Sequence, residues 1–192
     1  MYVNQGRPRD ATIDARILAA AKRQLAELGY EGMSLATVAH EAGTTRQALY
    51  RRWSTKAELA GAAVGSIDDL TDTPLGSREP FDALVAELAD FARGVSRPGR
   101  LSLVGTMLQE TTEVEVLRRY RSRIVQPRRR RLADILRAAQ RLGQIDQDAD
   151  LTVALTMCTG CWYGRALAGD PVPPDWPRRT ATLVWRALGG TR

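Results

Sequence analysis

The apolar positions near the start of the chain repeat with the period of a helix. Five of them lie at or near four-residue spacing, which places them on one face of an amphipathic helix. They are Ile13, Ile17, Ala21, Leu25 and Leu28. Gly29 follows directly, and glycine is suited to the C-terminal end of a helix. The pattern therefore predicts a first helix that ends near Gly29.

Helical spacing of apolar residues recurs along the rest of the chain. It predicts helices at about these positions: 35–41, 45–53, 56–67, 80–96, 100–110, 113–142, 149–168 and 175–188. We find no run that alternates between apolar and polar residues, and we predict no strands. The expected fold is all-α, with about nine helices. Pro127 lies inside the longest of them and should kink or interrupt it.

One segment between the predicted helices has the composition of a linker. Residues 68–80 read "DDLTDTPLGSREP" and are rich in Asp, Thr, Pro and Gly. We expect an N-terminal domain of residues 1–66 and a larger helical domain of residues 67–192.

The stretch "SLATVAHEAGTTRQALY" (34–50) has the features of a helix-turn-helix. Ala39 is small enough for the two helices to touch, and Gly43, four residues later, tolerates the positive φ of the turn. Apolar residues would face the first helix at Leu35, Val38, Ala42 and Leu49. The polar residues 44–47 would then enter the major groove of DNA, where Arg can bridge guanine and Gln can bridge adenine.

The region Arg16–Val64 resembles the N-terminal domain of the TetR/AcrR family of bacterial transcriptional repressors. The resemblance depends on "LAELGYEGMSLATVAHEAGTTRQALYRRWSTKAELA", including the Ala39 and Gly43 pair and Lys56 followed by Leu59. Trp53 stands where the family usually has Phe, and Thr44 where Val is common. Both departures are mild.

This resemblance implies roles for individual residues on DNA. Base contacts would come from Thr44, Thr45, Arg46 and Gln47, and phosphate contacts from Thr37, Tyr50 and Lys56. The alternative for Tyr50 is a core aromatic residue. Arg51 and Arg52 would be either phosphate ligands or part of a solvated surface. In the leader, Arg7 and Arg9 would lie along a minor groove or a phosphate strand, or else in a disordered tail.

The net charge of +6 is unevenly distributed. Residues 1–66 carry nine basic and six acidic groups, a modest excess that fits phosphate binding. Residues 67–116 carry four basic and ten acidic groups, whereas residues 117–142 carry ten basic and one acidic group. We interpret the basic run in 117–142 as a solvated helix face with salt links to the acidic block. The alternative is attraction of an anionic ligand or DNA.

One helix-turn-helix reads only a few base pairs, and a dimer gains specificity by spanning two half-sites. We expect the last two helices to form the two-fold interface, as they do in the family. The candidate residues are Leu155, Cys158, Trp162, Trp176, Leu183, Trp185 and Leu188. Packing within the monomer is the alternative for each of them.

In TetR relatives the middle helices enclose a small-molecule pocket, and ligand binding alters the spacing of the two DNA-reading heads. The candidate wall is apolar and aromatic. It comprises Phe91, Leu103, Met107, Tyr120, Ile124, Trp162 and Tyr163, with ordinary core packing as the alternative. The effector itself is not identified by any spacing.

Other chemistry has little support in the sequence. Cys158 and Cys161 lack the further ligands that a zinc site needs, and His40 is the only histidine. We find no nucleophile elbow, phosphate loop or acid–base pair, and we expect no enzyme activity, metal or cofactor. The leader has no apolar core of a signal peptide, and the longest uncharged run, Leu151–Gly164, is 14 residues, too short to span a membrane.

These observations predict a cytoplasmic, ligand-responsive regulator, most simply a repressor, that binds a near-palindromic operator in double-stranded DNA as a homodimer. The alternative is an architectural DNA-binding protein without a ligand.

Overall fold

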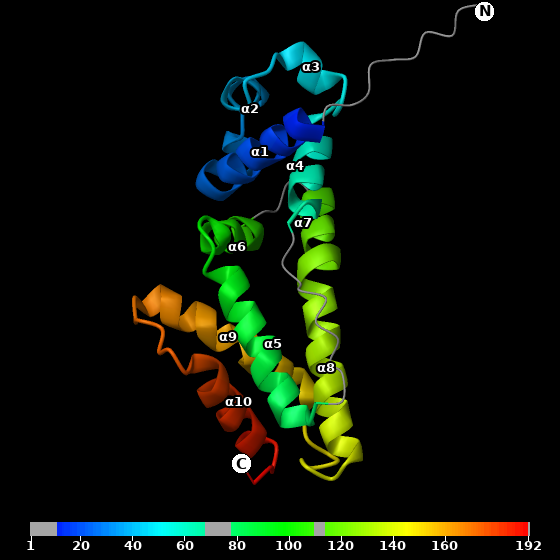
Figure 1. The fold of residues 1–192 in the computed structure, drawn as a ribbon, viewed down its shortest axis with the longest axis vertical. Coiled ribbons are helices and arrows are strands. Elements are labelled where there is room, and N and C mark those ends of the chain that lie inside the picture. Colours follow the sequence, from blue (N-terminus) through cyan, green and yellow to red (C-terminus); the bar gives the residue numbers. More distant parts are fainter. Residues whose placement is uncertain (1–10, 68–77, 110–113, 192) are drawn as a thin grey trace, which may run out of the picture. The chain divides into compact units, whose positions relative to one another are not determined.

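The computed structural model describes residues 11–67, 78–109 and 114–191. In these ranges every regular element is a helix (Figure 1). The elements are α1 (Ala11–Gly32), α2 (Leu35–Glu41), α3 (Arg46–Tyr50), α4 (Lys56–Gly65), α5 (Pro80–Val95), α6 (Arg100–Gln109), α7 (Val114–Tyr120), the π-helix η1 (Arg121–Val125), α8 (Gln126–Arg141), α9 (Leu151–Ala168) and α10 (Trp176–Ala187). The all-α prediction is confirmed.

We expected Gly29 to end a helix and Pro127 to kink or interrupt one. Gly29 does not end α1 but kinks it, since its φ of 72° and ψ of −179° are not helical and the helix is assigned as far as Gly32. Pro127 lies in the first turn of α8, where a missing N–H is tolerated, and the predicted interruption takes the form of a π-helical segment rather than a gap between helices. The π-helix η1 directly precedes this turn.

The described helices form two compact units. The described residues of the first unit are 11–67, 98–109 and 114–121, and those of the second unit are 78–97 and 122–191. We expected one division, between residues 66 and 67. The packing differs because α6 lies against α1 and α7 lies against α4, so both belong with the N-terminal helices. Thr106 of α6, for example, donates a hydrogen bond of 3.2 Å to the carbonyl of Leu25.

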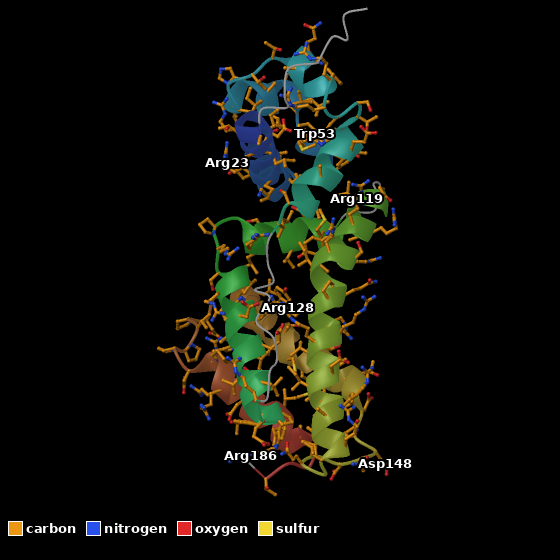
Figure 2. The ribbon with its side chains drawn as sticks, turned by 45° about the vertical axis from the view of Figure 1, so that its right-hand side comes forward. Arg23, Trp53, Arg119, Arg128, Asp148 and Arg186 are labelled. Carbon is orange, nitrogen blue, oxygen red and sulfur yellow. The ribbon has the colours of Figure 1, made fainter. Side chains whose placement is uncertain are left out.

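In the second unit, α5 packs against α8 and α10 around an apolar core. A buried ion-pair network also joins α5 to α8. Arg128, labelled in Figure 2, donates from Nη1 to Glu87 Oε1 at 2.9 Å and from Nη2 to Asp90 Oδ2 at 3.1 Å. Arg131 reaches Glu87 at 3.1 Å. The expected pairing between the basic run and the acidic block is present, but at Arg128 the expected solvated face is wrong, because this side chain is buried with its partners. The pairing satisfies charges that would be costly to bury alone.

The uncharged run of the sequence belongs to α9. Its inward residues Ala154, Cys158 and Trp162 are buried in the core of the second unit. Among the described helices, none has both the length and the apolar character needed to cross a membrane.

Candidate nucleic-acid interface

Helices α2 and α3 are joined by a tight turn at Gly43. Its φ is +63°, in the left-handed region that favours glycine. The backbone N–H of Gly43 donates to His40 O at 3.0 Å, and that of Thr44 donates to Ala39 O at 2.9 Å. Ala39 and Ala42 are buried at the contact between the helices. The turn therefore has the conformation that the spacing of Ala39 and Gly43 predicts.

Helix α3 is short, and both its start and its underside are fixed. Thr45 is the N-cap, and its hydroxyl oxygen accepts from Ala48 N at 3.1 Å. Leu49 is fully buried beneath the helix. Thr45, Arg46 and Gln47 are exposed, whereas Thr44 is half-buried. The predicted base-reading residues thus lie together on the first turn of a firmly anchored helix.

Tyr50 is exposed and shares a face of α3 with Arg46, whose guanidinium lies 6.0 Å from the centre of the Tyr50 ring. A core role for Tyr50 is therefore wrong, and a phosphate contact by this residue stays a prediction. Trp53, at the end of this segment, is half-buried. Thr37 is exposed on α2. Arg7 and Arg9 lie outside the described residues.

Arg52 is neither a solvated surface residue nor an obvious phosphate ligand. Its Nε donates to Asp14 Oδ1 on α1, and its Nη1 donates to Ala48 O at 3.0 Å. The Arg52 side chain is only 16% exposed. It connects the end of the recognition helix to α1, a role that sequence reasoning missed because the partners are 38 residues apart.

Lys56 is also engaged within the protein. Its Nζ donates to the backbone carbonyl of Glu31 at 2.9 Å and lies 4.8 Å from the centre of the Tyr30 ring. It is half-buried at the start of α4, where Thr55 is the N-cap. A phosphate contact by Lys56 stays a prediction, and it has to compete with this carbonyl.

Helix α2 is attached to α1 through Glu41. Arg23 donates to Glu41 Oε2 at 2.8 Å, and Gln24 donates to Oε1 at 3.0 Å. The hydrogen bond from Gln24, followed by that from Arg23, lowers the pKa of Glu41 from its ordinary value. All three elements of the DNA-reading head, α1, α2 and α3, are therefore joined by polar contacts as well as by their apolar core.

A helix-turn-helix whose second helix exposes a polar first turn is typical of DNA-binding proteins, and this chain has that arrangement at α2 and α3. Comparisons with protein families agree with this class. Residues 17–63 match the family described as bacterial regulatory proteins, tetR family, and residues 79–184 match the Tetracyclin repressor-like, C-terminal domain. The chain belongs to the TetR family of transcriptional regulators. Proteins of this family bind DNA and are regulators rather than enzymes.

Individual relatives include one full-length match. The chain is 26% identical over 199 positions to an uncharacterized HTH-type transcriptional regulator, YdeS, of Bacillus subtilis, with 100% of this chain and 96% of the relative covered. It is 32% identical over 117 residues to the DNA-binding transcriptional repressor TetR of Mycobacteroides abscessus, which covers 58% of this chain and 61% of that protein.

Solved structures share the fold. A TetR family transcription regulator from Marinobacter aquaeolei matches with a TM-score of 0.70 at 21% identity, over 96% of this chain and 98% of that chain. HlyIIR, a hemolysin II transcriptional regulator, matches with a TM-score of 0.69 at 17% identity, over 94% and 99%.

The seven residues predicted to line an effector pocket divide between the two compact units. Leu103, Met107 and Tyr120 belong to the first unit. The other four, Phe91, Ile124, Trp162 and Tyr163, belong to the second. There Phe91 packs edge-to-face against both Trp162 and Tyr163, with centroid distances of 5.9 Å. The pocket itself stays a prediction.

The residues predicted for the dimer interface also divide. Five of the seven are buried in the core of the protomer, and these are Cys158, Trp162, Trp176, Trp185 and Leu188. Leu155 is half-buried, and Leu183 is 66% exposed. The apolar stripes of α9 and α10 thus serve mainly the protomer, and any interface has to use neighbouring exposed positions.

One open groove of about 680 Å³ lies between α9 and α10. None of the seven predicted pocket residues lines it. Its walls include Val153, Met157 and Gly160 of α9 and Leu183 of α10. Because these residues are not used by the protomer core, the groove is a part of the last two helices that remains available to another molecule.

Proposed function

We propose that this protein is a ligand-responsive transcriptional repressor that binds a near-palindromic operator as a homodimer and is released by a small-molecule effector. The observation that carries the proposal is the first turn of α3, where Thr45, Arg46 and Gln47 are exposed on a helix that a cap and a buried leucine hold in place. A rigid polar turn of this kind suits the major groove.

Within this turn the roles follow from side-chain chemistry. Arg46 bridges guanine and Gln47 bridges adenine, while Thr44 and Thr45 contact neighbouring base edges. The Thr45 oxygen already accepts from Ala48 N, but its hydroxyl hydrogen can still be donated to DNA. Thr37, Tyr50 and Lys56 contact phosphates and fix the register of the head on the duplex. Arg7 and Arg9 add minor-groove or phosphate contacts.

The homodimer is formed by the last two helices, as is typical of the family. The exposed apolar residues of α9 and α10 support this assignment, since a contiguous apolar patch on a protein surface marks an interaction site. The effector binds in the helical C-terminal part. The cluster of Phe91, Trp162 and Tyr163 supplies apolar and aromatic surface of the type that small-molecule sites use.

The proposal is tested by selecting duplexes from a random DNA library with the full-length protein and footprinting the enriched sequence. We expect an inverted repeat whose half-sites are about one helical turn apart, since a two-fold dimer reads two equal half-sites. Enrichment of a single, non-repeated site would contradict the homodimer, while binding with no enriched sequence would favour the architectural alternative.

A further inference from the structure

One stripe of the exposed surface of α9 is apolar from Val153 to Leu167. Five residues share this face at positions i, i+4, i+7, i+11 and i+14, and we call them the α9 face: Val153, Met157, Gly160, Gly164 and Leu167. Val153 is 56% exposed and Leu167 is 92% exposed. No charged residue occurs between Asp150 and Arg165. A contiguous apolar face of this kind on a surface helix marks an interaction site.

Two glycines of the α9 face are not explained by the protomer. A Cβ atom at Gly164 would meet nothing within 4 Å, and one at Gly160 would meet only Thr156 Cγ2, at 3.8 Å. Both residues lie in the interior of a helix, where glycine costs about 1 kcal/mol relative to alanine. Since the protomer has room for a side chain at both positions, the missing Cβ atoms point to a close approach from outside.

We infer that two copies of the chain cross at Gly160, with α9 packed antiparallel on α9 of the partner subunit. The inference rests on the homodimer proposed above and adds its register. Val153 and Leu167 lie seven residues on either side of Gly160. A two-fold axis at Gly160 therefore places Gly160 against Gly160 of the partner subunit and Val153 against Leu167 of the partner subunit, and it brings Met157 within one residue of the level of Gly164 of the partner subunit. The glycines leave room for Met157 near the crossing, and the larger Val153 and Leu167 meet farther from it, so the face is complementary to itself.

The charges at the two ends of α9 favour the same antiparallel pairing. Residues 143–150, before the helix, contain three aspartates and no basic residue, whereas residues 165–179 contain three arginines and two aspartates. An antiparallel crossing brings the acidic start of one helix toward the basic end of the other. Arg165 Nε is buried and has no hydrogen-bond partner within the part of the chain that the structure describes. An acceptor from the partner subunit would satisfy it.

The groove between α9 and α10 provides space for the crossing. Its volume of about 680 Å³ adjoins Gly160, and its far wall carries Leu183, which is 66% exposed. Apolar side chains of the partner's α9 would fill this space and cover Leu183. The second copy thus buries both the α9 face and the exposed part of α10.

The first test replaces a glycine of the α9 face with alanine, which should weaken the dimer but not destabilise the helix. Gly164→Ala should raise the dimer dissociation constant at least about tenfold in sedimentation equilibrium. At protein concentrations below this constant, the helix content and thermal stability of the protomer should stay the same or rise, because alanine favours a helix more than glycine does. Gly105→Ala is the matched control, because Gly105 is an interior glycine of α6 whose Cβ would also meet nothing within 4 Å. It should stabilise its helix and leave the dissociation constant unchanged.

The second test addresses the register and leaves both glycines intact. In a Cys161→Ser background, the double variant Val153→Cys/Leu167→Cys should form disulfide-linked dimers with diamide as the oxidant, while each single variant should not. An intrachain bond is not feasible, because 14 helical residues span about 21 Å.

The outcomes separate this inference from the proposed function. A wild-type protein that sediments as a monomer at micromolar concentration would contradict the homodimer itself. Two results would overturn the crossing at Gly160 and leave the homodimer standing. One is a wild-type dimer whose dissociation constant Gly164→Ala does not change, and the other is disulfide cross-linking of the single variant Val153→Cys.

Discussion

Gln24 Nε2 donates a hydrogen bond of 3.0 Å to Glu41 Oε1, and this contact joins α1 to the last residue of α2. The carbonyl oxygen of the same Gln24 side chain accepts from the backbone N–H of Ser34, the N-cap of α2, also at 3.0 Å. One side chain, 2% exposed, therefore holds both ends of the helix against which the recognition helix packs. A buried amide is tolerated only when its hydrogen bonds are made, and here they fix the position of α2.

Exchanging the two partners tests this contact. Gln24→Leu should lower the free energy of unfolding by about 1–3 kcal/mol, because it leaves the Ser34 N–H without its acceptor. Gln24→Glu should also destabilise, since it places two carboxylates together. Combining it with Glu41→Gln restores a donor and an acceptor and should recover most of the loss in chemical denaturation. Glu27→Gln, an exposed change on the same helix, is the control. If the double variant is no more stable than Gln24→Glu, the bond contributes nothing.

The pKa of Glu41 gives this contact a pH dependence. The hydrogen bond from Gln24, and next that from Arg23, lowers this pKa in the folded protein below its ordinary value of 4.5. The bonds therefore stabilise the folded state above about pH 4.5, and this stabilisation is lost as the pH falls through the folded-state pKa. Between pH 6 and this acidic range, wild type should lose more unfolding free energy than Glu41→Gln. Equal losses would show that Glu41 does not contribute.

Arg52 and Arg51 are adjacent arginines with different expected effects. Arg52→Ala removes the bonds to Asp14 and to the Ala48 carbonyl, and should lower the free energy of unfolding by about 1–3 kcal/mol. Arg51 is exposed, so Arg51→Ala should leave stability within about 0.5 kcal/mol of wild type. Thermal and chemical unfolding of the two variants measure this difference. Equal stability would mean that the contact with α1 does not hold α3.

The local features of the DNA-reading head could be predicted from the sequence, because each depends on a few neighbouring residues. Gly43 supplies the positive φ of the turn and Thr45 the cap of α3, and both signals lie within four residues of what they control. The contacts of Arg52 and Gln24 could not be predicted in this way. Their partners are 38 and 17 residues distant, and only the packed fold brings them together.

The apolar stripe of α10 illustrates a second limit. Periodicity predicts that one face of a helix is covered, but it does not say whether the cover is the same protomer or another copy. Trp185 is 1% exposed and packs on Phe81, whereas Leu183, two residues earlier, is exposed. Composition alone ranks tryptophan as the better interface residue, and for this reason the sequence-based choice favoured side chains that the protomer itself buries.

Arg46 and Lys56 should affect DNA binding in different ways. Arg46→Ala should relax the base preference at one position of each half-site of the selected duplex. The loss of discrimination against the wrong base at that position should be about 1–3 kcal/mol. Lys56→Ala should weaken selected and scrambled duplexes alike and reduce the salt dependence. Binding titrations at several salt concentrations distinguish the two. A changed sequence preference in Lys56→Ala would contradict a phosphate role, and its bond to Glu31 O would then be the reason to retain the lysine.

Cys158 and Cys161 should differ in their reaction with iodoacetamide. Cys158 is fully buried, and burial raises the pKa of its thiol to about 12, so about one molecule in 10,000 carries the thiolate at pH 8. Cys161 is exposed and lines the groove between α9 and α10. Mass spectrometry should find a single alkyl group, on Cys161, and Cys161→Ser should abolish the labelling.

Because the second copy covers this groove, labelling of Cys161 should slow as the protein concentration passes the dimer dissociation constant. Rapid labelling of Cys158 in the native protein, or labelling of Cys161 that does not depend on concentration, would contradict this arrangement.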